Sequence, residues 1–275
     1  MDKRVIKRVI KTVVLLVSLG SMQTAMALER ARLGLIDEGE FSFLTGLEYE
    51  EGAYGTADST SLWRVPLNIS FRKKNIGLFA SVPLLLATSD GDIITSNKTS
   101  MRRSDTTASQ KRAQTVTGIG DILLSASYYL TPDYRNETTY RMTATLKLGT
   151  ADEAKGLGTG ENDLFIEGGF LKNIDEYILS GTLGYEISGD SSLFLYNNVF
   201  YVTAGLSKRL EMNSQIGTYL YFSQSITDNS DSPLELSVFY TQPVAKNRSI
   251  YLFFSKGFSD ASPDFSIGGT IQFYY

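Results

Sequence analysis

The sequence predicts an all-β protein, a transmembrane antiparallel up-and-down β-barrel of about 12 strands over residues 40–275. Three observations predict this fold class. Apolar residues recur at every second position, which is the period of a strand with one apolar face. Short and long connections alternate between the expected strands, and aromatic residues gather at the strand ends. After residue 27, no segment approaches the roughly 20 consecutive apolar residues of a spanning helix, so we expect strands to cross the membrane.

Residues 1–27 have the order of a secretory signal peptide. A basic head precedes a short apolar run, Thr12–Leu19, and small residues lead to an expected cleavage site after Ala27. The apolar run is too short to span a bilayer. We expect residues 28–39 to be an N-terminal periplasmic segment, which could be a short helix, a tail or a partial plug of the lumen.

The residue types that are missing narrow the function. The chain has no cysteine and no histidine, so it lacks the imidazole of Ser-His-Asp and Cys-His catalytic systems and of most zinc sites. We therefore expect no enzymatic activity, no cofactor and no metal. Residues 1–27 hold five basic residues and one acidic residue, so cleavage would change the formal net charge from −4 to −8. An acidic chain is a poor candidate for binding nucleic acid.

Twelve segments are long enough for the 9–11 residues that a tilted strand needs to cross a bilayer. The alternation is clearest where Trp63, Val65 and Leu67 alternate with polar neighbours, and it is weaker in the sixth and eleventh segments. In chain order, the expected strands are 40–51, 60–73, 75–88, 118–131, 138–150, 163–172, 176–188, 194–208, 213–226, 233–243, 248–259 and 264–275.

The connections differ systematically on the two sides of the predicted barrel. Those after even-numbered strands include the short turns 73–75, 173–175 and 245–247, whereas those after odd-numbered strands include the long loops 89–117 and 151–162. Outer-membrane barrels have short periplasmic turns and long extracellular loops. The lengths therefore predict which end of each strand faces the periplasm.

Aromatic residues on the apolar face occur near the expected strand ends, as in the girdles at the two membrane interfaces. A secreted β-sandwich would also alternate apolar and polar residues, but nothing in a sandwich requires aromatic ends or loops sorted by length. The expected periplasmic girdle is Phe71, Tyr128, Tyr140, Phe170, Tyr177, Tyr240 and Phe273, and the outer girdle is Tyr49, Trp63, Tyr185 and Phe265.

Charged residues lie on the opposite, inward face of the expected strands. On the lipid face, Arg or Lys near the midplane would cost about 2–4 kcal/mol. The charges either form a constriction that selects solutes by charge and size, or form cross-strand ion pairs that stiffen the wall of a narrow lumen. Lys256 is a further candidate, and inward apolar residues such as Leu44 and Phe239 are interspersed. The lumen candidates are Glu48, Glu50, Arg64, Asp121, Arg141, Lys147, Glu167, Glu186 and Glu235.

Pro66 and Pro83 are expected to face one another across the second and third strands if the hairpin turns near Asn75. Neither has a backbone N–H to donate to a neighbouring strand. We expect a bulge that weakens this seam. The bulge is either purely structural or a lateral opening through which an apolar solute leaves the lumen.

The loop Ser89–Gly118 is rich in Ser and Thr and carries five basic residues against three aspartates. At the cell surface these cations could contact lipopolysaccharide phosphates, or the loop could fold inward as a constriction. A solvated surface loop is the simplest expectation.

The C-terminal segment "SIGGTIQFYY" resembles the signal by which the insertion machinery recognises bacterial outer-membrane barrels. Apolar residues occupy alternate positions, and an aromatic residue is last. This resemblance implies that the insertion machinery and outer-membrane lipid are partners, and that the protein is in the bacterial outer membrane. The residues that carry it are Ile267, Ile271, Phe273 and Tyr275.

Two internal segments resemble the outer-membrane family labelled as the MetA pathway of phenol degradation, whose members are regarded as transporters. They are "TGIGDILLSASYYL" (Thr117–Leu130) and "LKLGTADEAKGLGTGENDL" (Leu146–Leu164). The family often has Pro-Thr-Gly after the lysine, where this chain has Leu-Gly-Thr at 148–150. The resemblance implies a passive channel for small aromatic or hydrophobic solutes. The alternatives are a non-selective small porin, and an occluded barrel with a structural or surface-interaction role.

The stretch "KGLGTGEND" (Lys155–Asp163) superficially resembles a phosphate-binding glycine loop. Such a loop must open a helix whose free N–H groups face the phosphate. Alternating strand patterns flank this stretch on both sides, so the glycines are better explained by an extracellular turn region.

Overall fold

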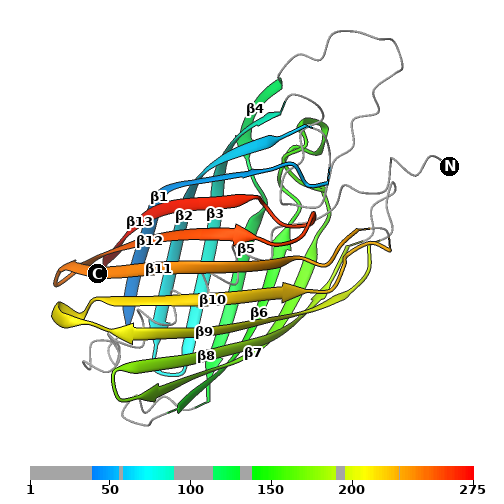
Figure 1. The fold of residues 1–275 in the computed structure, drawn as a ribbon. Helices are drawn as coiled ribbons and strands as arrows, with labels where there is room; N and C mark the ends of the chain where they lie inside the picture. The colour runs from blue at the N-terminus through cyan, green and yellow to red at the C-terminus, as the bar shows by residue number, and fades with distance from the viewer. Residues whose placement is uncertain (1–38, 56–57, 90–113, 131–137, 190–195, 229) are drawn as a thin grey trace, which may run out of the picture.

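The computed structural model describes residues 39–55, 58–89, 114–130, 138–189, 196–228 and 230–275. One antiparallel sheet closes into a barrel, because β1 pairs with both β2 and the last strand, β13 (Figure 1). The strands are β1 (Glu40–Gly52), β2 (Thr60–Lys73), β3 (Ile76–Ser89), β4 (Gln114–Ile119), β5 (Ile122–Tyr129), β6 (Thr138–Leu148), β7 (Asp163–Ile174), β8 (Tyr177–Ile187), β9 (Val199–Arg209), β10 (Gln215–Ser223), β11 (Leu234–Ala245), β12 (Arg248–Gly257) and β13 (Phe265–Tyr274).

The predicted barrel of 12 strands is confirmed, and the fourth predicted strand is divided into β4 and β5. Both halves pair with β3, but their registers differ by one residue. Val82 and Pro83 of β3 lie opposite three residues, 120–122, so the chain bulges between β4 and β5. This strand also begins earlier than expected, at Gln114.

The barrel is inside-out compared with a soluble protein. On β2, Trp63 and Ile69 point outward and are 41% and 56% exposed, whereas Arg64 and Asn68 point inward and are buried. The same alternation of exposed apolar and buried polar residues continues around the sheet. A wall with this pattern suits lipid outside and a polar lumen inside.

Short turns join the strands at one end of the barrel. Residues 74–75, 175–176 and 246–247 are turns of two residues, and the backbone is left-handed at Lys74 (φ 49°) and Asp175 (φ 51°). The C-terminus lies at this same end (Figure 1). Two turns of 3₁₀ helix, Glu153–Lys155 and Glu211–Asn213, lie in the connections.

Among the residues described, no helix is long and apolar enough to cross a membrane.

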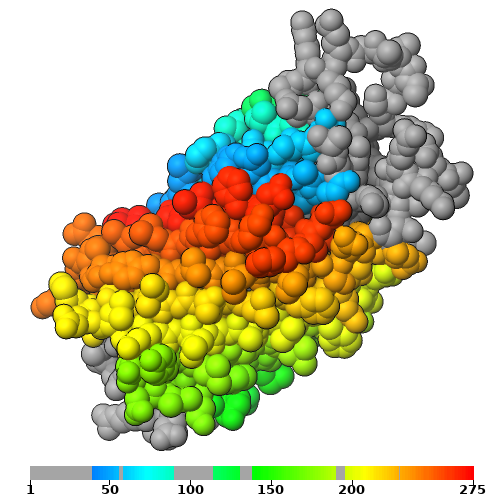
Figure 2. Space-filling view, in the orientation of Figure 1, coloured from blue at the N-terminus to red at the C-terminus, as the bar shows by residue number. Residues whose placement is uncertain are grey.

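Aromatic side chains contact one another near both ends of the outer wall. The ring centroid of Tyr49 is 4.7 Å from that of Trp63 and 5.9 Å from that of Phe265, which continues to Phe254 at 6.5 Å. At the opposite end, Phe41 and Phe71 are 4.6 Å apart. Figure 2 shows the outer surface in the same orientation as Figure 1, with neighbouring strands packed side by side into a continuous wall.

Three expectations concern residues outside the described ranges. They are the signal peptide 1–27, nearly all of the segment 28–39, and the basic part of the loop between β3 and β4.

Candidate functional site: the barrel lumen

The nine charged residues expected in the lumen lie on the inner side of the wall, where eight of them belong to three separate groups and Arg141 lines a small cavity. Register and burial place them at inward positions of β1, β2, β6, β7, β8 and β11, with Asp121 in the bulge. Lys256 is different, because it is exposed and lies opposite Leu236 and Phe265 on the outer face. The expectation that Lys256 faces the lumen is therefore wrong.

The first group is centred on Arg64. Its Nη1 lies 3.4 Å from Oε2 of Glu48, directly opposite on β1, and its Nη2 lies 4.0 Å from Oε2 of Glu50. The hydroxyl of Tyr54 donates a 2.8 Å hydrogen bond to Oε1 of Glu50. All four side chains are buried, so the loop after β1 contributes a residue to the lumen.

Tyr54 could not be recognised from the sequence as a lumen residue, because it lies in a connection where no strand period applies. Its backbone is left-handed (φ 49°), and its ring is buried with its hydroxyl on Glu50. Burial, and next the negative charge of Glu50, raise the pKa of Tyr54. The hydroxyl acts as a donor to Glu50.

The second group places carboxylates beside tyrosines. The hydroxyl of Tyr201 donates a 2.9 Å hydrogen bond to Oε1 of Glu167. Glu235 lies opposite Tyr221 in the register of β10 and β11, and Glu186 accepts a bond from Ser188. Glu186 and Glu235 are almost completely buried.

Aromatic rings cover the inner wall from β9 to β12. Tyr219 stacks on Phe239 at 4.9 Å, with 14° between the ring planes, and Phe239 stacks on Tyr251 at 5.8 Å. These rings form one buried cluster with Leu44 of β1 and Tyr274 of β13. The apolar side of the lumen is therefore aromatic.

Glycines on neighbouring strands make room for these rings. A Cβ atom at Gly184 would come within 2.1 Å of the Tyr201 ring, and one at Gly205 within 2.4 Å of the Tyr219 ring. The aromatic residues and the glycines are each visible in the sequence. Their pairing across strands is not, because it depends on register.

Arg141 lies in the half of β6 near the short turns. It lines a small cavity with hydroxyl groups and apolar side chains: Thr139, Gly169, Phe170, Leu171, Ser180 and Thr182. Glu167 lies opposite Thr143, two residues further along from this end, and accepts a hydrogen bond from Tyr201.

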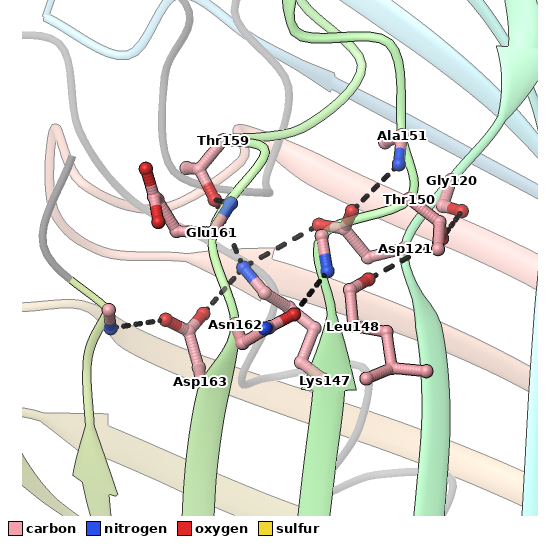
Figure 3. A network of polar contacts seen from close by, with 12 residues as sticks. Gly120, Asp121, Lys147, Leu148, Thr150, Ala151, Thr159, Glu161, Asn162 and Asp163 are labelled. Atoms are coloured by element: carbon pink, nitrogen blue, oxygen red, sulfur yellow. Dashed lines mark hydrogen bonds and ion pairs between the residues drawn. The ribbon is translucent and has the colours of Figure 1, made fainter. Parts of the chain in front are cut away.

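The third group is the Lys147 network (Figure 3). The Nζ atom of Lys147 lies 2.5 Å from Oδ2 of Asp163 and 3.5 Å from Oδ2 of Asp121, and it donates to Oγ1 of Thr159 at 3.3 Å. Both ion pairs are almost inaccessible to solvent. Two carboxylates from different parts of the wall therefore share this lysine.

Backbone groups complete the Lys147 network. Oδ1 of Asp121 accepts a bond from the N–H of Ala151 at 3.0 Å, and Oδ1 of Asp163 accepts one from the N–H of Gly189 at 2.9 Å. Asn162 accepts from the N–H of Gly149 at 3.0 Å. The two segments that carry the family resemblance, 117–130 and 146–164, thus meet at this network.

The glycine-rich stretch does belong to a loop between strands, β6 and β7, and not to the start of a long helix. Gly156 and Gly160 have positive φ angles of 77° and 72°. Gly158 has a different role, since a Cβ atom there would lie 2.5 Å from Cβ of Ala151 and 3.0 Å from the Asp121 carboxylate. Gly158 lets the loop approach the bulge closely.

The prolines face each other as expected, but the bulge is elsewhere. Pro66 lies opposite Pro83, and β2 pairs with β3 without a register shift from Thr60 to Lys73. The interruptions flank this seam: the β1–β2 ladder stops at Leu67 and resumes at Arg64, and the bulge lies between β3 and β4–β5. The reason is that neither missing proline N–H points towards the other proline. The N–H position of Pro66 faces β1, and that of Pro83 faces β4–β5.

The C-terminal residues close the barrel against β1. Phe273 lies opposite Phe43, Ile267 lies opposite Tyr49, and the N–H of Tyr275 donates to the carbonyl of Phe41 at 2.9 Å. Ile267 and Tyr275 are exposed on the outer face, whereas Phe273 and Ile271 are half-buried.

Among the described residues, no group of three or more Asp or Glu side chains is placed to hold a metal ion.

Residues 45–275 match the protein family described as "Putative MetA-pathway of phenol degradation". The chain belongs to this family. The match covers nearly all of the barrel and both segments that carry the resemblance. No curated protein matches the chain.

Several solved structures of outer-membrane barrels are similar to the chain. A KdgM porin aligns with a TM-score of 0.52 at 11% identity, covering 84% of this chain and 98% of that one. A KdgM porin in complex with disordered oligogalacturonate aligns at 0.50 and 9% identity, covering 85% and 98%. At these identities the similarity shows the fold alone. The fold is that of an outer-membrane β-barrel, which supports an outer-membrane location.

Proposed function

We propose that the protein is a passive channel of the bacterial outer membrane for small, aromatic or hydrophobic solutes, with a narrow mixed-charge lumen. The observation that carries the proposal is the row of stacked rings on the inner wall, of which Tyr219, Phe239 and Tyr251 are members. Aromatic rings attract other rings beyond the area that they bury. A planar apolar solute can therefore replace ring–ring contacts as it passes.

The charged side chains of the lumen support the same proposal, because they disfavour the passage of polar solutes. Arg64 and its carboxylates are already paired and buried, so they offer few free hydrogen-bonding groups to replace the water around a sugar. A polar solute loses hydration without full compensation in such a lumen. The family membership is consistent with a phenolic solute, and a non-selective small porin is the first alternative.

The second alternative is an occluded barrel with a structural or surface-interaction role. It is favoured by the burial of the inner side chains, since Leu44, Phe239 and Tyr251 are at most 3% exposed. Partners in either role would be outer-membrane lipid, lipopolysaccharide and the insertion machinery.

Uptake into proteoliposomes tests the proposal. Phenol and a sugar of similar size should enter at different rates, with phenol faster, and Phe239→Ala should reduce the difference. Val238→Ala is the matched control, because Val238 is the outward-facing neighbour on β11 and is exposed. Equal rates for both solutes would favour a general porin. A folded barrel that admits neither solute and is silent in planar bilayers would favour the occluded barrel.

A further inference from the structure

The loop between β6 and β7 folds into the barrel, and Leu157 is its most deeply inserted residue. Leu157 has no exposed surface and belongs to one buried cluster with Leu62 of β2 and with Leu85 and Ala87 of β3. Those three residues lie at inward positions of the wall. The loop therefore occupies part of the lumen at the end opposite the short turns.

The wall is shaped to receive Leu157. A Cβ atom at Gly118 of β4 would come within 2.5 Å of Cδ1 of Leu157. Ala151, near the start of the same loop, joins the buried cluster, and Val116 of β4 packs against it. A larger residue at position 118 would push the leucine further into the lumen.

The Lys147 network attaches both ends of this loop to the wall. At the start of the loop, Ala151 donates to Asp121, and at its end Thr159 accepts from Lys147. Lys147 also pairs with Asp163, the first residue of β7. Without the ammonium group, two buried carboxylates would face each other without a cation between them, which disfavours the closed arrangement.

We infer that Leu157 sets the width of the barrel mouth at the end opposite the short turns. Lys147 is the positioning residue that holds Leu157 against the wall. The inference rests on the proposed channel function and adds to it the residue that sets the size limit. Because the loop occupies part of the lumen at this mouth, the volume of the Leu157 side chain restricts the space that remains for a solute.

The absence of cysteine from the chain allows a direct test with an introduced disulfide. In Gly118→Cys/Leu157→Cys, oxidation should lock the loop to β4, and a reductant should release it. Single-channel conductance in planar bilayers is measured before and after reduction. We expect the released form to fluctuate between a lower and a higher conductance, and the locked form to stay at one level.

Side-chain volume gives a second, independent measurement. Leu157→Ala should raise the conductance by about twofold and admit larger phenols, since pore diameter controls permeation, and Lys147→Gln should increase the fluctuations. Leu86→Ala is the matched control, because Leu86 is an outward-facing leucine of β3 beside the same cluster. Folding of every variant is checked by its heat-modifiable mobility on gels.

The outcomes separate this inference from the proposed function. If the barrel conducts but oxidation, Leu157→Ala and Lys147→Gln all leave its conductance unchanged, Leu157 does not set the mouth, and the channel function stands. If every folded variant is silent and also fails to admit phenol, both the inference and the channel function are overturned.

Discussion

Arg64 lies directly opposite Glu48 on the neighbouring strand, with 3.4 Å between Nη1 of the guanidinium and Oε2 of the carboxylate. Glu50 is within 4.0 Å of the same guanidinium. On the inner wall nearby, Glu186 and Glu235 add two further buried carboxylates. Glu48 and Glu50 thus share one guanidinium, an excess of one acidic group over basic ones among these three residues.

This excess predicts a preference for cations over anions. The reversal potential under a KCl gradient should be cation-selective, because the field of the carboxylates raises the local concentration of cations. Glu48→Gln/Glu50→Gln should move the permeability ratio towards unity. Glu51→Gln, on the outward face of the same strand and bonded to Tyr49, should leave it unchanged. Anion selectivity of the unmodified barrel would contradict the prediction.

The Lys147 network predicts a large loss of stability when its cation is removed. Lys147→Met keeps an unbranched side chain of similar length but removes the ammonium group from beside Asp121 and Asp163, so the free energy of unfolding should fall by about 3–5 kcal/mol. Urea unfolding in lipid vesicles measures it. Lys155→Met is the control, because Lys155 pairs with Asp152 in an exposed part of the same loop, and it should change stability little. Equal effects of the two variants would show that burial of the Lys147 network is unimportant.

The contact of Tyr201 with Gly184 predicts a strong effect of a single methyl group. In Gly184→Ala the new Cβ would lie 2.1 Å from the ring, so the ring must rotate away and lose its bond to Glu167. We expect the free energy of unfolding to fall by about 1–3 kcal/mol, as at other overpacked sites. Gly168→Ala on β7 is the control, because nothing lies within 4 Å of the place that its new Cβ atom would occupy. Comparable melting temperatures would contradict the prediction.

The two prolines test the lateral opening. Pro66→Val/Pro83→Val restores both backbone N–H donors. The restored donors should strengthen the pairing of β2 with β1 and of β3 with β4–β5. If apolar solutes leave through this region, uptake of a hydrophobic phenol should fall. Because β2 and β3 are already paired without interruption, we expect unchanged uptake and a higher melting temperature. Reduced uptake by a more stable barrel would instead support the opening.

The C-terminal residues predict an assembly defect that differs from a loss of stability. Phe273→Ala and Tyr275→Ala should reduce the amount of folded barrel in the outer membrane, because both are part of the expected insertion signal. Ile250→Ala is the control. Ile250 is on β12, opposite Ile271 of β13, and the substitution removes a comparable apolar side chain outside the C-terminal segment. Refolding of the purified variants into lipid vesicles should be normal. A defect that also appears in purified vesicles would assign these residues to stability alone.

Much of the barrel could be predicted because strands obey a period of two. The alternation at Trp63 and Ile69 against Arg64 and Asn68 determines which face is outward, and a shift by one residue would place every charge in lipid. The same rule explains the error at Lys256. Its segment alternates weakly, with Phe253 and Phe254 adjacent, so the face could not be assigned from its own residues.

The candidate site was less predictable because its contacts join residues that are distant in the sequence. Asp121, Lys147 and Asp163 each have the appearance of ordinary inward charges. Their meeting depends on the bulge between β4 and β5, which adds one residue and redirects Asp121 towards the loop. Nothing local in the sequence specifies that Leu157 fills the space above Gly118.

By itself, the sequence determined the barrel class, most strand positions, most of the inward charges and the side on which the loops are long, because these follow from local periods and lengths. Only the tertiary structure decided the partners: Arg64 with Glu48 and Glu50, Tyr201 over Gly184, and one lysine between two aspartates. The physical reason is register. Inward-facing side chains meet others from neighbouring strands and loops, and their neighbours are defined only when the sheet closes.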